Sequence, residues 1–136
     1  MILDILNRIA DEPGSNAKMD ILREYVNNST LQKVIYLTLS PRVKFWIKQI
    51  PIHTTKFRLA NIDWAIEHLS DIMNREVTGD AAKDHLSYIL SSIDAGDAEV
   101  IKKIIQKDLK IGMNVSNVNK VFPKLIEVTP YMGAVA

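Results

Sequence analysis

Apolar residues recur at helical spacing along most of this 136-residue chain, and the pattern is clearest over residues 97–122. On a period of about 3.6 residues, one face of this segment carries Ile101, Ile104, Ile105 and Leu109. The opposite face carries three lysines, Lys103, Lys107 and Lys110. Gly112 follows, and glycine suits the left-handed conformation that ends many helices. The pattern therefore predicts an amphipathic helix with one basic face, then a break, then a short second helix.

The residues on either side of the break predict a site for an anion. Asp97 is expected to cap the first helix, and Asn114 or Ser116 is expected to cap the second. The first-turn amides of the second helix, those of Asn117 and Val118, are expected to point outward without partners. Exposed amides beside lysines attract anions, and phosphate is the anion that we expect here.

The other apolar patterns predict an all-α fold, a compact single domain of about six to eight short helices packed orthogonally. Helices are predicted over residues 2–11, from Ser15 or Asn16 to Asn27, after a cap at Thr30, from Ser40 to Pro51, from Asn61 to Arg75 and from Thr78 to Ile93. Ser40 and Pro41 suit the cap and the first position of a helix. Trp46 lies on the apolar stripe of that helix and is expected in the core. Trp64 lies off its stripe and is expected to pack beneath the preceding loop.

The composition is that of one folded domain. Hydrophobic residues make up 47% of the chain, which is enough for a single core at this length. There is no cysteine, so disulfides and thiolate metal sites are excluded. The first ten residues are interrupted by polar side chains and predict neither a signal peptide nor a membrane span. We therefore expect a soluble, cytoplasmic monomer without membrane contacts.

Charge is unevenly distributed although the net charge is only +1. Residues 40–60 hold five basic and no acidic groups, residues 61–99 hold nine acidic and two basic groups, and residues 100–136 hold six lysines and two acidic groups. If the two basic zones meet, they form a surface suited to nucleic acid. Solvated helix faces give the same clustering, so this pattern alone leaves both interpretations open. On charge alone, further candidate phosphate contacts are Arg42, Lys44 and Lys120.

A second candidate phosphate site lies at Thr78 and Gly79. These residues are predicted to open a helix, and a glycine in the first turn lets a ligand approach closely. Asp80 and Asp84 would repel a phosphate there. Ordinary capping explains the same residues.

No pattern of residues indicates catalysis. Asp63, Glu67 and Asp71 recur every four residues beside His68, but Glu-x-x-His and His-x-x-x-His ligand spacings are absent. A solvated acidic face is therefore expected in place of a metal site. Phosphate-binding glycine loops and nucleophile motifs are also absent. We expect no catalytic residue, no metal ligand and no cofactor in this chain.

Four segments, in collinear order, carry a likeness to a known family: MILDILNRIA, YLTLSPRVKFWIKQIP, VTGDAA and IIQKDLKIGMNVSNVNKVFPKLIEVTP. The chain resembles the N-terminal DNA-binding domain of ATP-dependent DNA ligases, most closely those of T-even-type bacteriophages. The last segment is the most specific. An Asp-Leu-(Lys/Arg)-Ile-Gly step that leads into a short helix recurs in the DNA-binding domains of this family.

The resemblance implies an all-helical domain that binds nicked duplex DNA from the minor-groove side, mainly through phosphates. Lys110 and Gly112 occupy the basic and glycine positions of the family step. Asn114, Ser116 and Asn117 occupy the helix start that follows. This DNA-binding domain is expected over residues 1–128, and residues 129–136 are expected to form an extended exit toward a nucleotidyltransferase domain.

Catalysis in the family depends on a lysine in a Lys-x-Asp-Gly motif, which becomes adenylated, and this chain has no such motif. The resemblance therefore implies that ATP and Mg²⁺ serve the whole ligase, which seals nicks in replication, repair and recombination. The chain alone is expected to be catalytically inactive. If the protein is phage-encoded, it works in the host cytoplasm. The alternative is a helical module that docks a replication partner through the acidic zone or through Trp64.

Overall fold

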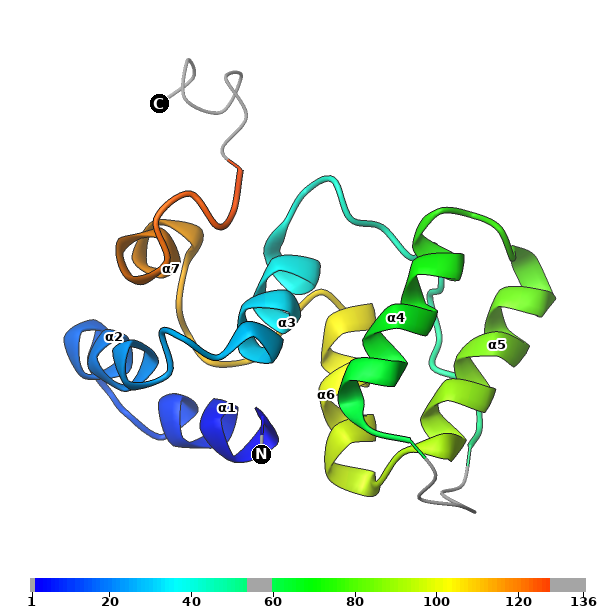
Figure 1. Ribbon diagram of the computed structural model, residues 1–136, viewed down its shortest axis with the longest axis horizontal. Helices are drawn as coiled ribbons and strands as arrows, with labels where there is room; N and C mark the ends of the chain where they lie inside the picture. The colour runs from blue at the N-terminus through cyan, green and yellow to red at the C-terminus, as the bar shows by residue number, and fades with distance from the viewer. Residues whose placement is uncertain (1, 54–59, 128–136) are drawn as a thin grey trace.

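The computed structural model describes residues 2–53 and 60–127, which contain seven α-helices and no β-strand (Figure 1). The helices are α1 (Ile2–Ala10), α2 (Ser15–Glu24), α3 (Ser29–Leu39), α4 (Ile62–Met73), α5 (Gly79–Ser92), α6 (Ala95–Ile105) and α7 (Val115–Val121). The predicted compact all-α domain is therefore confirmed. The predicted exit over residues 129–136 lies outside the described residues.

Helix α6 is the centre of the packing. It contacts α1, α3, α4 and α5, and Figure 1 shows it between the first three helices and the pair α4–α5. Its Val100, Ile101 and Ile104 are fully buried, which confirms the predicted apolar face. Asp94 caps the helix by accepting the amide of Asp97 at 2.8 Å, so the predicted cap was placed three residues too late.

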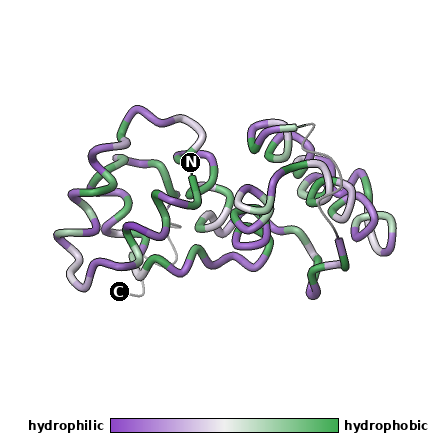
Figure 2. Tube along the Cα trace, turned by 90° about the horizontal axis from the view of Figure 1, so that it is seen from below, coloured by the Kyte–Doolittle hydropathy of each residue, from purple (hydrophilic) through white to green (hydrophobic). Residues whose placement is uncertain are grey.

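Helices α1, α2 and α7 form the second part of the fold. α2 packs on both α1 and α7, and α1 joins this group to α6, on which α3 and α4 also pack. Hydrophobic and hydrophilic residues alternate along the helices in Figure 2, which is what one-sided burial requires. No helix within residues 2–53 and 60–127 is long and apolar enough to cross a membrane.

Asparagine side chains fix the starts of three helices. Asn28, Asn61 and Asn114 accept the amides of Leu31, Trp64 and Asn117 at 2.9, 2.9 and 2.8 Å. The cap at Asn114 was predicted, and Asn61 was predicted as a helix start without a cap being assigned to it. The predicted cap at Thr30 is wrong, because Asn28 takes that role and the Thr30 hydroxyl donates to Asp63 at 2.8 Å.

The helix predicted from Ser40 to Pro51 does not form. Beyond a single turn after Ser40, the segment has no regular secondary structure as far as residue 53. Its side chains alternate instead: Val43 and Phe45 are buried, and Lys44 and Trp46 are exposed. Alternation with a period of two is typical of an open, non-helical chain, although Trp46 itself has a left-handed φ of 54°, so the apolar residues here were assigned the wrong period.

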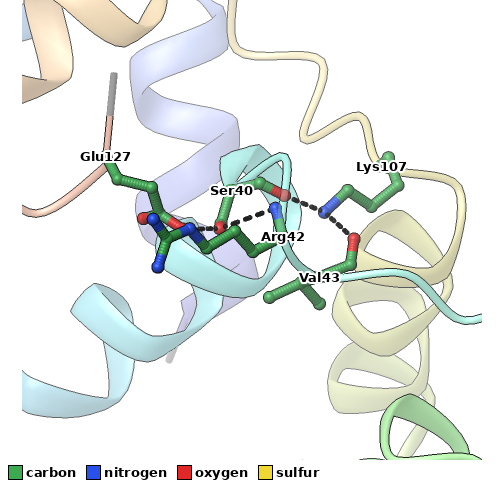
Figure 3. A network of polar contacts seen from close by, with 5 residues as sticks. All are labelled: Ser40, Arg42, Val43, Lys107 and Glu127. Atoms are coloured by element: carbon green, nitrogen blue, oxygen red, sulfur yellow. Dashed lines mark hydrogen bonds and ion pairs between the residues drawn. The ribbon is translucent and has the colours of Figure 1, made fainter. Parts of the chain in front are cut away.

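The hydrogen bonds of two carbonyl groups explain why this segment is not helical. In a helix, the carbonyls of Ser40 and Val43 would accept from amides four residues later. Both instead accept from the side-chain nitrogen of Lys107 at 2.8 Å (Figure 3). A distant side chain thus replaces the helical hydrogen bonds, and the backbone stays open.

The two tryptophans lie in different surroundings. Trp46 is 57% exposed, so its predicted place in the core is wrong. Trp64 is half-buried between the ring of His68, at a centroid distance of 4.1 Å, and the edge of Tyr88, at 5.7 Å. Most of the loop predicted to cover Trp64, residues 54–59, lies outside the described residues.

The alternation at residues 43–46 can be tested by truncation. Phe45→Ala is expected to lower the free energy of unfolding by about 3–5 kcal/mol, because a buried ring leaves a cavity. Trp46→Ala is expected to cost less than about 1 kcal/mol, since the ring is exposed and holds one cation–π contact. Urea denaturation followed by circular dichroism measures both. The reverse order would support a helix with Trp46 in the core.

Candidate nucleic-acid interface

The loop between α6 and α7 forms one wall of a polar hollow of about 370 Å³. Five of the predicted DNA-binding residues line it: Lys107, Lys110, Gly112, Asn114 and Asn117. Ser15 of α2 and Leu39 of α3 contribute to the other side. The fold therefore brings together residues that the sequence linked only by their spacing.

Helix α6 ends before this loop. Its last residue is Ile105, so the predicted helical face that continued through Leu109 is wrong. The amide of Lys107 bonds to Ile104 O and the amide of Asp108 bonds to Lys103 O, both at 3.0 Å. This is a Schellman cap with Lys107 in the left-handed position, at a φ of 59°.

Gly112 has a φ of 68°, as its predicted left-handed conformation requires. It lies in the loop, however, and not at the end of α6. A Cβ atom added to Gly112 would lie 3.1 Å from the side-chain nitrogen of Lys18. Glycine thus lets the loop backbone approach a lysine of α2.

Lys107 is a half-buried tether and not part of an open basic face. Its ammonium group has three N–H donors, and they reach the carbonyls of Leu37, Ser40 and Val43, each at 2.8 Å. Burial lowers the pKa of this lysine, against the opposing influence of Glu127. With every donor engaged, Lys107 fixes the chain after α3 to the end of α6.

Sequence reasoning missed Lys18, which holds the far side of the same loop. Its side chain is only 8% exposed, and its nitrogen donates to Ile111 O at 2.7 Å and to Ile9 O at 3.3 Å. A signal was present, because Lys18 shares a helix face with the buried Ile21 and Leu22, where a solvated lysine is not expected. One buried lysine, Lys18, and one half-buried lysine, Lys107, therefore shape this loop.

Arg42 belongs to a polar network that fixes the segment after α7 (Figure 3). The Ser40 hydroxyl donates to Glu127 Oε1 at 2.6 Å, and Arg42 Nε lies 3.6 Å from the same oxygen. The Ser40 hydrogen bond, and then the Arg42 charge, lower the pKa of the Glu127 carboxyl. The Arg42 side chain is still 77% exposed, so it reaches solvent.

The amides at the start of α7 were predicted to be open, and this prediction is wrong. The amide of Asn117 bonds to Asn114 Oδ1 at 2.8 Å, and the amide of Val118 bonds to Asn114 O at 3.1 Å. The Asn114 cap itself causes this, because its side chain and carbonyl satisfy both donors. Ser116 is exposed beside them.

The remaining predicted contacts are spread over the surface. Lys120 is exposed in the last turn of α7, and Lys103 is partly exposed in the last turn of α6. Lys44 is exposed and lines a second hollow, of about 400 Å³, which it shares with Lys107. Thr78 and Gly79 begin α5, which lies across α6 from α7 (Figure 1).

The acidic residues of α4 are engaged with neighbouring helices. Asp63 accepts from Thr30 of α3, and Asp71 Oδ2 lies 3.3 Å from His85 Nε2 of α5. Within the described part of the chain, no three acidic or histidine side chains lie close enough together to hold a metal ion.

Replacing Lys107 tests its role as a tether. Lys107→Met keeps much of the length but leaves three carbonyls without their donor, so we expect the free energy of unfolding to fall by about 2–4 kcal/mol. Lys110→Met is the matched control, because Lys110 is exposed and has nearly the same backbone φ, 57°. Urea denaturation measures both variants. Equal stability of the two would contradict the assignment.

No protein-family model matches the chain. The DNA ligases of Enterobacteria phages T4 and T6 are each 33% identical to it over an aligned length of 138 residues. The alignment covers 98% of this chain. The chain spans 28% of the length of these relatives.

Two solved structures, Pmar-Lig_PreS3 and Pmar-Lig_Pre, share the fold, with TM-scores of 0.84 and 0.77. They cover 94% and 93% of this chain at 23% and 24% identity, and the chain covers 31% of each. At this identity the likeness to the solved structures supports the fold alone, while the higher identity to the phage ligases supports a family relationship. The chain is therefore related over nearly its whole length to the DNA ligases of T-even phages, and it corresponds to the N-terminal part of such a ligase.

Proposed function

We propose that the chain binds nicked double-stranded DNA, without reading its sequence, as the DNA-binding domain of an ATP-dependent DNA ligase. The observation that carries this proposal is the polar hollow at the α6–α7 loop. Lys110, Gly112, Asn114 and Asn117, which occupy the family step and the helix start after it, line this one hollow. The relationship to the phage ligases supports the same function.

The side chains at this surface suit phosphate better than base edges. Lys110 and Lys120 are exposed cations, and Asn114 and Ser116 offer polar groups beside them. Contacts of this kind position a protein on the duplex but carry no sequence information. Gly112 is exposed and has no side chain, so a DNA strand can approach the loop backbone closely.

Lys107 and Lys18 act differently in this proposal. Their nitrogens are bound to backbone carbonyls, so they hold the loop in shape and leave the phosphate contacts to the exposed lysines. A loop fixed before DNA arrives loses little conformational entropy on binding. In this proposal Lys18 and Lys107 hold the shape of the loop, and Lys110 and Lys120 contact the phosphates.

Nick sealing itself belongs to the whole ligase in this proposal. The chain has no Lys-x-Asp-Gly motif and no glycine-rich phosphate loop, so its own residues do not fit ATP or Mg²⁺. We assign those cofactors to the parent enzyme, which acts in replication, repair and recombination in the cytoplasm of the phage host. The chain supplies affinity for the duplex and makes no bond.

A titration by fluorescence anisotropy tests the proposal. Nicked and intact duplexes of two unrelated sequences are titrated with the chain at several salt concentrations. If roughly four to six phosphates are neutralised, the logarithm of the binding constant should fall with the logarithm of salt concentration at a slope of about −4 to −5. Affinity should be the same for both sequences. No binding at low salt, or a strong preference between the sequences, would contradict the proposal.

The proposed contacts can be removed with charge-neutral substitutions. Lys110→Gln combined with Lys120→Gln should weaken binding by roughly 10- to 50-fold at 0.1 M salt and flatten the slope by about 2, because two phosphate contacts are lost. The control is Lys83→Gln combined with Lys33→Gln, which changes the net charge equally at exposed positions on α5 and α3. Equal losses from both pairs would mean that only net charge matters.

Docking of a replication protein is the second candidate function. A hollow of about 590 Å³ between α3 and α4 has an apolar floor that includes Leu37, Leu69 and Met73, with Lys33 and Lys124 also among its lining residues. This combination fits an amphipathic helix with acidic flanks. Such binding would survive high salt and would not require DNA, which distinguishes it from the first candidate.

A further inference from the structure

Trp46 and Arg75 form an exposed pair where the segment after α3 meets the end of α4. The guanidinium carbon of Arg75 lies 4.5 Å from the centroid of the indole ring. Trp46 is 57% exposed, and Arg75 is exposed as well. The pair therefore contributes little to the core, and its chemistry faces solvent.

The backbone conformation at the end of α4 does not favour an arginine. The amide of Arg75 bonds to Ile72 O at 3.1 Å and the amide of Glu76 bonds to Asp71 O at 2.9 Å, which makes a Schellman cap. Arg75 holds the left-handed position of this cap, at a φ of 59°. Glycine is the residue best suited to that position, because a Cβ atom is strained there. The arginine is thus explained by its side chain and not by the helix end.

The stacked guanidinium is arranged to receive an anion. Stacking on an indole face holds the plane of the fork while its N–H groups remain at the edge. No hydrogen bond or ion pair joins these N–H groups to another residue within 2–53 and 60–127. The nearby carboxylate of Asp71 is paired with His85. Trp46 also shares its hollow of about 400 Å³ with Lys44 and Lys48, which are both exposed.

A planar fork held by an aromatic ring matches the geometry of a backbone phosphate. We propose that Arg75 is a phosphate contact for duplex DNA and that Trp46 positions its guanidinium group. This contact is separate from the hollow at the α6–α7 loop and extends the interface to the end of α4. The inference rests on the proposed DNA-binding function.

Three substitutions of Arg75 test the contact by anisotropy titration with a nicked duplex. Arg75→Gln should weaken binding about fivefold to tenfold at 0.1 M salt and flatten the salt slope by about 1, because one phosphate contact is lost. Arg75→Gly should do the same while its melting temperature stays equal to or above that of the wild type, since the backbone strain is relieved. Arg75→Lys keeps the charge without the fork, so it should recover less than half of the loss on a logarithmic scale.

The role of Trp46 is tested by a double-mutant cycle. Trp46→Ala should weaken binding about threefold in the wild type and have no effect in the Arg75→Gly background, because a positioning residue acts only through its partner. Equal effects in both backgrounds would show that Trp46 contacts DNA on its own account and would overturn the positioning role. The matched control for charge is Arg23→Gln, an exposed arginine of α2 that is paired with Asp20.

The outcomes separate this inference from the proposed function. If the wild type binds and loss of Lys110 and Lys120 weakens it, but Arg75→Gln behaves like Arg23→Gln, the Arg75 contact is overturned and the function stands. If the wild type shows no salt-dependent binding to duplex DNA, both are overturned. Full affinity of Arg75→Lys would reduce Arg75 to a simple surface charge and reject the stacked fork.

Discussion

The ammonium group of Lys107 donates to three backbone carbonyls in α3 and the segment after it, and much of the surface described above depends on these hydrogen bonds. They draw carbonyls away from helix formation, so the segment leaves α3 in an open conformation. Val43 and Phe45 then turn inward, while Lys44 and Trp46 face solvent. One half-buried cation therefore holds the segment on the path that exposes these side chains.

Local patterns in the sequence were sufficient for most of the helices. Amphipathic spacing identified the buried face of α6, and an asparagine at the helix start identified the cap of α7. The same reasoning failed at residues 40–51. There the competing hydrogen bonds come from Lys107, more than sixty positions later in the chain. Periodicity within a short window contains no information about such a partner.

The sequence predicted where the candidate site lies, but not what each of its lysines does. The spacing of Lys110, Gly112 and Asn114 located the loop, and the fold places them around one hollow. The helix face of Lys18 indicated its burial, but nothing local to Lys107 did, because the carbonyl groups that engage its side chain belong to α3 and the segment after it. Trp46 was assigned to the core because its segment was read as a helix, and the hydrogen bonds that keep the segment open come from the distant Lys107. The division between lysines that shape the loop and lysines that reach a ligand is a property of the tertiary structure.

The most direct test of this account is to follow the backbone amide signals of the isotope-labelled chain by NMR during titration with a nicked duplex. We expect the largest shifts in the α6–α7 loop and the start of α7, with further shifts at residues 42–48 and Arg75. The exposed surface of α1 and the last turn of α2 should remain unchanged. Shifts confined to the hollow between α3 and α4, or no shifts at low salt, would contradict a DNA-binding surface built on this loop.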